Sequence, residues 1–354
     1  MLRQIRGEIL LLLTLTGFAV AGCGGTKTAP PPDEVTSGDI LPPYAISAKP
    51  HVGSLSVHSS TREGGDQQPA PAPDGSWFVF ASTRNSEEPQ IYRQPSAGSI
   101  VTQLTQGPIA HIQPAVSPDG RQIAFAGRDS GSWDIWIMPA GGGPRENLNS
   151  TLDLDEISPT WHPKGKVLAF NCQKSSGGEW WLCAKARGSS GVSWITPGMN
   201  PDWSPKGDMI VFQRAKKRGK REFSLWIVKV SVDANGLVAG GAESQIVSNP
   251  AWGAVEPVFS PDGTRIAFTA IDLTDKSANV KGGDIWCVRT DGTDLIRLTN
   301  TVEEDWDPAW SGQPGDTSTN GRVFFACERN GHMNIWSLLP ALSGAPGIMP
   351  GLAP

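Results

Sequence analysis

Residues 257–268 read PVFSPDGTRIAF, and residues 114–125 repeat the pattern as PAVSPDGRQIAF. Ser-Pro-Asp-Gly predicts a tight turn: proline presets φ at the second position, aspartate bonds its own backbone, and glycine relieves the last position. The segment after each turn, such as residues 266–268, is apolar on both faces, which is typical of a strand buried between two neighbours. The motif therefore predicts two strands joined by a turn.

The same pattern occurs six times along the chain. Residues 159–170 and 201–212 carry Pro-Lys-Gly at the turn, residues 69–80 carry Pro-Asp-Gly, and residues 308–325 contain an insertion. Successive copies begin 45, 45, 42, 56 and 51 residues apart, at Pro69, Pro114, Pro159, Pro201, Pro257 and Pro308. This period is that of a β-propeller blade and not of a helical repeat.

An aromatic strand follows each copy of the motif, at Tyr92, Trp136, Trp181, Trp226, Trp286 and Trp336. A fourth strand then closes five of the repeats, ending near Thr105, Asn149, Thr196, Val247 and Thr299. The sixth repeat has no such ending, because residues 341–354 are rich in Pro, Gly and Ala and are expected to form a disordered tail. We expect residues 53–58, GSLSVH, to supply the missing strand and remove an exposed sheet edge.

The predicted fold is therefore all-β: a six-bladed β-propeller of four-stranded blades over residues 51–340, with its last blade closed by an N-terminal strand. Composition agrees, because Gly and Pro together make up 71 of 354 residues and favour turns over long helices. A formal net charge of −5 offers no basic face for a phosphate backbone, so we expect no nucleic-acid partner. We expect the propeller to be monomeric.

The N-terminus reads as an export signal. Arg3 and Arg6 precede an apolar run over residues 9–20, which is too short to span a bilayer. Residues 20–23, VAGC, resemble the lipobox of bacterial lipoproteins. This resemblance implies a signal peptide over residues 1–22 and a lipidated Cys23, in an exported protein anchored to a bacterial membrane and facing the periplasm or the outer surface.

The alternative is an ordinary signal peptide, which would leave Cys23 as a free thiol. Residues 23–50 contain six prolines and little apolar periodicity, so we interpret them as a flexible tether. A tether of this length spans roughly 30 Å as a coil and about 80 Å as an extended polyproline chain.

The blades resemble those of the TolB propeller and related periplasmic proteins, which carry WD40-like, or PD40, repeats. Three features carry the resemblance: the Ser-Pro-Asp-Gly motif, Asp-Ile-Trp in the third strand and Leu-Thr in the fourth. It covers about residues 54–340 and implies the fold, whereas one fold hosts many activities. TolB has an α/β domain before its propeller, where this chain has the lipobox and tether.

Acidic residues just before the innermost strands should surround one mouth of the central channel. A charged funnel of this kind could bind a peptide, a basic segment of a partner or a cation, and the resemblance to TolB implies a partner near the channel mouth. Solvated loop charges are the alternative. The candidate partner-binding residues are Asp155, Glu156, Glu256, Glu304, Asp305 and Asp307.

We expect a basic loop at residues 216–221 to lie at the same end of the propeller as this channel mouth. We interpret the loop as a soluble tip and not as a contact with lipid headgroups.

Four cysteines fall within the repeats. Cys172 and Cys183 lie on paired strands of the third blade, and Cys287 and Cys327 lie on adjacent blades. We expect disulfides Cys172–Cys183 and Cys287–Cys327 in an oxidising compartment, with four buried thiols as the alternative. No CxxC pair or nearby His supports a metal site, and no cofactor is expected.

The sequence favours a lipid-anchored, non-enzymatic propeller that binds a protein or peptide partner in the bacterial cell envelope. It has no Gly-x-Ser-x-Gly elbow, and its Asp-Gly turns differ from the Asp-x-Gly of sialidase Asp boxes. One alternative is an envelope glycan or other small ligand, stacked on Trp252 and Trp306. A less favoured alternative is a channel-metal lactonase using Asn200, Glu256 and Asp307.

Overall fold

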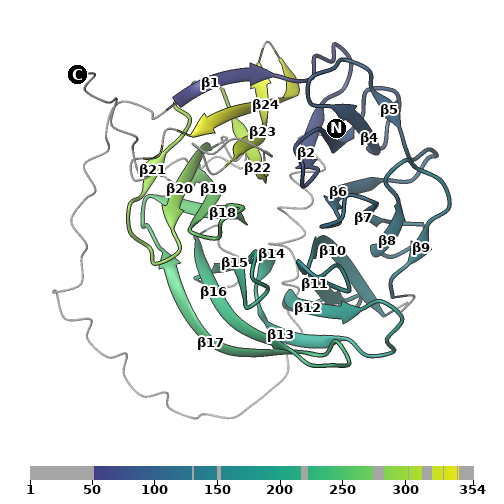
Figure 1. Ribbon diagram of the computed structural model, residues 1–354, viewed down its shortest axis with the longest axis vertical. Coiled ribbons are helices and arrows are strands. Elements are labelled where there is room, and N and C mark those ends of the chain that lie inside the picture. The colour runs from purple at the N-terminus through teal and green to yellow at the C-terminus, as the bar shows by residue number, and fades with distance from the viewer. Residues whose placement is uncertain are drawn as a thin grey trace, which may run out of the picture.

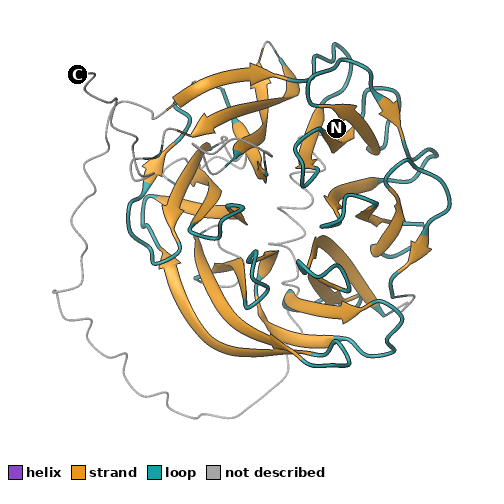
Figure 2. Cartoon of the chain, in the orientation of Figure 1, coloured by secondary structure: helices purple, strands orange, loops and turns teal. Residues whose placement is uncertain are grey.

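The chain forms a ring of six β-sheets around a central axis (Figure 1). The computed structural model describes residues 52–129, 131–149, 153–216, 222–273, 283–301, 303–312, 321–329, 331–340 and 342. Within these residues every regular element is a strand and none is a helix (Figure 2). The predicted all-β, six-bladed propeller is confirmed. Cys23, the tether, residues 217–221 and nearly all of the tail lie outside the described residues.

Each sheet is one blade of four antiparallel strands, ordered from the channel outward. Blades 1 and 2 are β2 (Asp66–Pro71), β3 (Trp77–Ser82), β4 (Gln90–Pro95) and β5 (Thr102–Gln103), then β6 (His111–Val116), β7 (Gln122–Gly127), β8 (Asp134–Pro139) and β9 (Glu146–Asn147). Blades 3 and 4 are β10 (Leu154–Trp161), β11 (Val167–Lys174), β12 (Trp181–Ala186) and β13 (Ser193–Pro197), then β14 (Met199–Trp203), β15 (Met209–Ala215), β16 (Phe223–Val232) and β17 (Val238–Val247). Blades 5 and 6 are β18 (Trp252–Phe259), β19 (Arg265–Asp272), β20 (Asp284–Arg289) and β21 (Ile296–Arg297), then β22 (Asp305–Ser311), β23 (Arg322–Arg329), β24 (His332–Pro340) and β1 (Val52–Val57).

The repeat motif builds the core between blades. The phenylalanine that ends each copy lies on the second strand and is fully buried, at Phe80, Phe125, Phe170, Phe212, Phe268 and Phe325. Burying one such side chain stabilises the fold by roughly 1.5–3 kcal/mol. These residues contribute to apolar clusters that extend across neighbouring blades, so each blade depends on its neighbours for burial.

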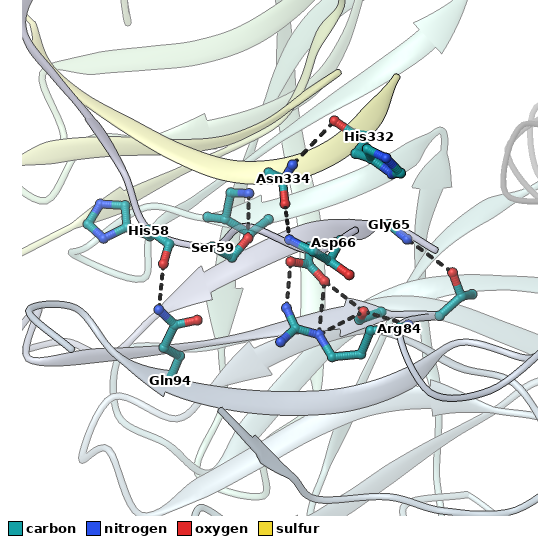
Figure 3. Close-up of polar contacts among 12 residues, drawn as sticks. His58, Ser59, Gly65, Asp66, Arg84, Gln94, His332 and Asn334 are labelled. Carbon is teal, nitrogen blue, oxygen red and sulfur yellow. Dashed lines mark hydrogen bonds and ion pairs between the residues drawn. The ribbon is translucent and has the colours of Figure 1, made fainter. Parts of the chain in front are cut away.

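The N-terminal strand closes the ring, as the sequence predicts. Strand β1 pairs with β24 as the outermost strand of blade 6, with Leu55 opposite Leu338 and Val57 opposite Trp336. Beyond β1, the Ile335 amide donates to Ser59 Oγ at 2.9 Å, and the Thr61 amide donates to Asn334 Oδ1 at 2.7 Å (Figure 3). The first described segment of the chain is therefore bonded to the last blade.

The same segment also contacts blade 1. The His58 carbonyl accepts a hydrogen bond from Gln94 Nε2 of blade 1. The His58 ring packs edge-on against Phe78 of blade 1 and stacks on Phe324 of blade 6, with centroids 5.6 Å and 4.8 Å apart. A few residues on, buried Asp66 accepts from Arg84 NH2 at 2.6 Å (Figure 3). Residues 58–66 thus join the two blades where the ring closes.

The two rims of the propeller have different origins. The Ser-Pro-Asp-Gly turns form one rim, where Gly120 N donates to Ser117 O and Ser117 Oγ donates to Asp119 Oδ1 at 2.6 Å. The third strands end beside these turns, since the Thr290 amide donates to Thr264 O. We call this the turn rim. The opposite rim, with the connections between blades and the loops from second to third strands, is the connection rim.

Deleting residues 51–60 should destabilise the whole propeller. The deletion removes β1 and Ser59, exposes the edge of β24 and leaves the Ile335 amide without its acceptor, so we expect a loss of at least about 3 kcal/mol. The measurement is thermal or denaturant unfolding. As a control, Val57→Ser changes a side chain that is 55% exposed and should cost less than about 0.5 kcal/mol. An unchanged midpoint after the deletion would contradict closure by β1.

Candidate functional site

One residue in each innermost strand has a left-handed backbone. The six residues precede the repeat prolines, and their φ angles are 53° at Gln68, 53° at Gln113, 54° at Ser158, 49° at Asn200, 56° at Glu256 and 54° at Asp307. Each lies where the register with the second strand shifts, so each strand carries a bulge at the channel. All six side chains are partly exposed, on the strands nearest the axis (Figure 1).

Hydrogen bonds link these residues around the channel. On one side, the Gln68 amide donates to Asp307 Oδ2 at 3.1 Å, which joins blade 1 to blade 6. The Gln113 amide donates to Gln68 Oε1 at 2.8 Å, and the Ser158 amide donates to Gln113 Oε1 at 2.9 Å. A side chain of one blade thus satisfies the backbone N–H that the bulge of the next blade removes from its ladder.

The second half of the circle uses two additional side chains. Ser158 Oγ donates to Asn200 Oδ1 at 3.0 Å, while the Asn200 amide donates to Asn171 Oδ1 at 2.7 Å. Gln213 Oε1 accepts from both Asn200 Nδ2 and the Glu256 amide. The Asp307 amide donates to Glu256 Oε2 at 3.0 Å and completes the circle. We call Gln68, Gln113, Ser158, Asn200, Glu256 and Asp307 the channel ring.

The channel ring is polar, and its charge is negative. Glu256 and Asp307 supply two carboxylates on adjacent blades, and the other four members are amides or a hydroxyl. Towards the turn rim, Asp202 accepts from Thr160 Oγ1 at 3.0 Å and from the Phe259 amide at 2.7 Å. Burial raises the pKa of Asp202 to about 6. These seven residues include no cation, so the channel favours cationic or hydrogen-bond-donating groups.

The six predicted partner-binding carboxylates fall into three environments. Glu256 and Asp307 belong to the channel ring. Asp155 and Glu304 lie partly exposed on the connection rim, where Asp155 Oδ1 accepts from the Trp133 amide at 3.0 Å and Glu304 Oε2 accepts from Trp306 Nε1 at 3.4 Å. Glu156 and Asp305 are fully buried, so the exposed funnel that includes them is not formed.

Buried Glu156 joins blades 2 and 3. Its amide donates to Trp133 O at 2.6 Å, and its Oε1 accepts from Asn149 Nδ2, whose Oδ1 in turn accepts from Lys185 Nζ at 3.2 Å. Burial, with a smaller contribution from the charge of Asp134, raises the pKa of Glu156 to about 7. Glu156 is therefore placed to act in the contact between blades and not as an exposed partner-binding group.

Asp305 occupies the equivalent place between blades 5 and 6. Its amide donates to Gly283 O at 3.0 Å, and burial raises its pKa to about 6. The position three residues before the repeat proline is buried in every blade, where it holds Asp66, His111, Glu156, Gly198, Ala254 and Asp305. Its composition does not reveal this burial, because four of the six residues are titratable.

The cysteines differ from the expectation at one pair. Cys172 and Cys183 form a disulfide between β11 and β12. Cys287 and Cys327 do not form one, and both are buried free thiols. Each has its own polar neighbour, since Cys287 interacts with Arg265 and Cys327 Sγ accepts from Arg329 Nε at 3.2 Å. Burial raises the pKa of Cys287 to about 12.

The aromatic residues considered for sugar stacking are used in packing. Trp306 is only 5% exposed. Trp252 stacks on Trp286 and on Phe268, with centroids 5.5 Å and 5.9 Å apart. Trp306 is therefore enclosed, whereas Trp252 is partly exposed and stacks on two aromatic rings of its own blade.

Metal-ligating side chains do not cluster in the described part of the chain: no group of three or more His, Cys, Asp or Glu could hold an ion there. The three residues considered for a lactonase are all in the channel ring. Asn200, Glu256 and Asp307 each accept a hydrogen bond from a neighbouring blade. These three residues therefore belong to the hydrogen-bonded channel ring, and within that ring Glu256 and Asp307 are the two residues that carry carboxylates.

The buried carboxyl of Glu156 should make stability depend on pH. Its folded pKa of about 7 lies above the ordinary value of 4.5, so its stabilising contribution is complete below 4.5 and is lost as pH rises to about 7. Glu156→Gln cannot ionise, so between about pH 4 and pH 8 it should gain up to about 3 kcal/mol relative to the parent. Urea unfolding across this range measures the difference.

Asp155→Asn is the matched control, because it removes a carboxylate one residue away while keeping an acceptor for the Trp133 amide. It should leave the pH profile of the parent unchanged. If the free energy of unfolding changed with pH in the same way for Glu156→Gln and the parent, the pKa of Glu156 would be equal in the folded and unfolded states, which would contradict the prediction.

The disulfide should stabilise the propeller. It joins residues separated by 11 positions, and closing a loop of this length contributes about 3 kcal/mol. Reductant should therefore lower the unfolding midpoint of the parent, measured with and without dithiothreitol. A Cys172→Ser/Cys183→Ser chain should show the lower midpoint in both conditions, whereas Cys287→Ala/Cys327→Ala should keep the response. A parent that does not respond to reductant would contradict a stabilising bond.

Comparisons with known proteins agree with this architecture. Residues 57–190 match the family described as the TolB beta propeller domain, PD40. No protein of curated function matches the chain. Among the described residues, no helix has the length and apolar character needed to cross a membrane.

Solved structures share the fold at low identity. A protein of Agrobacterium tumefaciens assigned to TolB superposes with a TM-score of 0.54 at 21% identity, over 66% of this chain and 80% of that one. TolB from Acinetobacter baumannii gives 0.53 at 15%, over 76% of this chain and 65% of its own length. An oligogalacturonate lyase from Vibrio parahaemolyticus gives 0.54 at 10%, over 80% and 93%. Enzymes and TolB proteins therefore both have this fold.

Proposed function

We propose that this six-bladed β-propeller, whose residues 57–190 match the TolB propeller family, binds a protein or peptide partner in the bacterial cell envelope without acting as an enzyme. The partner would contact the connection rim and the adjoining mouth of the channel. In this proposal the protein is exported and is held on a membrane by lipidated Cys23.

The observation that carries this proposal is the presence of carboxylates at two levels of the propeller, the connection rim and the channel ring. Asp155 and Glu304 are partly exposed on the connection rim, and Glu256 and Asp307 follow in the channel ring. A partner segment with amide or cationic donors could bind both levels, because carboxylates accept charge-assisted hydrogen bonds. The rim supplies a wide surface, and the channel adds a site for one projecting side chain.

The position of the chain ends supports this choice of rim. Val52 begins β1 opposite Pro340, the last residue of β24, and β24 ends at the turn rim. A tether that leads from Cys23 to Val52 would therefore join the propeller at the turn rim. The connection rim lies on the other side and would face away from the membrane.

The buried groups favour binding over catalysis. Glu156 and Asp305 have raised pKa values because of burial, as a general acid would, but both are enclosed between blades. His111 is also enclosed, with its ring nitrogens on Gln90 Oε1 and Asp129 Oδ2 at 2.9 and 3.1 Å. These groups stabilise contacts between blades and do not face a substrate.

In-cell photo-crosslinking should capture a discrete protein from the connection rim. A photoreactive residue placed at Asp155 or Glu304 is expected to give one dominant protein adduct, identified by mass spectrometry. The same residue at Thr264, exposed on the turn rim, is the control and should not give that adduct. Glu256→Gln/Asp307→Asn should lower the yield from Glu304 at least severalfold if the channel contributes.

A Cys23→Ala chain separates binding from anchoring, since it tests whether capture requires the membrane. A folded propeller that gives no protein adduct from either rim position would contradict the proposal and favour a glycan or small ligand in the channel.

A further inference from the structure

The turn rim has a basic side at blades 3 and 4. The turns of blades 1, 2 and 5 carry Asp74, Asp119 and Asp262 at their third position, whereas those of blades 3 and 4 carry Lys164 and Lys206. All five residues are exposed. Charge therefore changes sign across this rim, with lysines on two adjacent blades.

The two lysines are not needed to build their turns. In the aspartate turns, the carboxylate accepts the serine hydroxyl and a backbone amide, as Asp119 does from Ser117 and Arg121. In blade 3, His162 Nδ1 accepts from the Lys164 amide at 3.1 Å instead. In blade 4, Ser204 Oγ accepts from the Asp208 amide at 3.2 Å. The ammonium groups of Lys164 and Lys206 are thus available for contacts outside the chain.

Exposed apolar side chains lie on the same two blades. Trp194 is 44% exposed and Leu237 is 50% exposed. Trp194 lies in β13 of blade 3, where its ring is edge-on to Trp181 with centroids 6.0 Å apart. Leu237 lies in the β16–β17 hairpin of blade 4, which reaches β13 where Val238 N donates to Ser193 Oγ at 3.0 Å (Figure 1). Both lie beside the loops from third to fourth strands, which belong to the turn rim.

We call Lys164, Lys166, Lys206, Lys229, Trp194 and Leu237 the basic–apolar patch. Its four lysines are exposed. Exposed Asp262 of blade 5 lies beside Lys206, since a Cβ on Gly263 would be 3.3 Å from Pro205 Cδ, and the other carboxylates among the lysines are Asp208 and Asp233. Both of these bond their own loops, since Asp233 Oδ1 accepts the amides of Asn235 and Leu237 and Asp208 Oδ1 accepts from Ser204 Oγ. Nearby Arg187 is paired with Glu146. The patch keeps a net positive charge.

We infer that the basic–apolar patch docks on an anionic membrane surface and holds the propeller with its turn rim towards the bilayer. This inference rests on the proposed anchor at Cys23. Lysines near a membrane are attracted by anionic headgroups, and tryptophan favours the interface between headgroups and acyl chains. The chain meets the propeller at the same rim, since β1 begins at Val52 opposite Pro340.

Docking of this kind depends on the anchor for its strength. Each lysine contributes about a fivefold gain in affinity near an anionic surface, so the patch alone gives weak, reversible binding. A tether of 28 residues between Cys23 and Val52 makes the contact intramolecular and raises its effective concentration. The docked propeller would present its connection rim to the opposite side, where the proposed partner binds.

Vesicle sedimentation tests the patch without the lipid anchor. The chain without the signal peptide (residues 1–22) and with Cys23→Ala is mixed with vesicles of phosphatidylcholine alone or with one third phosphatidylglycerol. We expect binding only to the anionic vesicles, weakened by added salt. Lys164→Gln/Lys166→Gln/Lys206→Gln should reduce the partition coefficient at least about tenfold. Trp194→Ser/Leu237→Ser should remove the binding that remains at high salt.

Ile100→Ser is the matched control, because Ile100 is 77% exposed on the turn-rim loop of blade 1, across the ring from the patch. It should bind as the parent does, and unfolding midpoints of all variants should stay close to the parent. Equal binding of the triple lysine variant and the parent, or equal binding to both vesicle types, would overturn the inference. Mass spectrometry of Cys23 in the unmodified chain tests the anchor separately, so each idea can fail alone.

Discussion

The bulge in each innermost strand sets the central constraint on this propeller. A left-handed residue before the repeat proline takes its own N–H out of the sheet ladder, and a side chain of a neighbouring blade or strand must accept it. Such backbone conformations cost about 1–3 kcal/mol each and persist only when their surroundings fix them. The six blades are therefore mutually dependent at the axis, as they are in the apolar clusters farther out. Closure by β1 matters for the same reason, because an open ring would leave the Asp307 to Gln68 bond unsupported.

The fold could be predicted almost completely because its signals are local and repeated. A turn motif, a buried strand after it and a fixed period determine the blade. Because the pattern occurs six times, a departure from it in one copy does not hide the repeat. The closing strand could also be predicted, from the number of strands in each repeat. The sixth repeat has only three, and residues 53–58 precede the first repeat without a partner strand of their own. The long β16–β17 hairpin was not predicted, because its length follows from packing against blade 3 and not from the repeat.

The candidate site was predicted less well, because charge in a sequence does not reveal burial. Glu156 and Asp305 were grouped with Asp155 and Glu304, although adjacent residues of a strand face opposite environments. The hydrogen-bonded circle that includes Glu256 and Asp307 was not predicted, because it joins residues about 45 positions apart. The cysteine pairs show the same limit. Paired strands brought Cys172 to Cys183, whereas adjacent blades did not bring Cys287 to Cys327.

The two rims suit different tasks because different constraints act on them. The turn rim is built from short, self-bonded turns, so a substitution such as Asp to Lys there changes surface charge while His162 or Ser204 maintains the turn. The connection rim contains the loops that differ most between blades, and its carboxylates continue into the channel. Surface charge can therefore change on the turn rim without disturbing the channel ring. A protein held at the turn rim keeps the more variable rim free, and this separation allows membrane attachment and partner recognition to be changed independently by substitution.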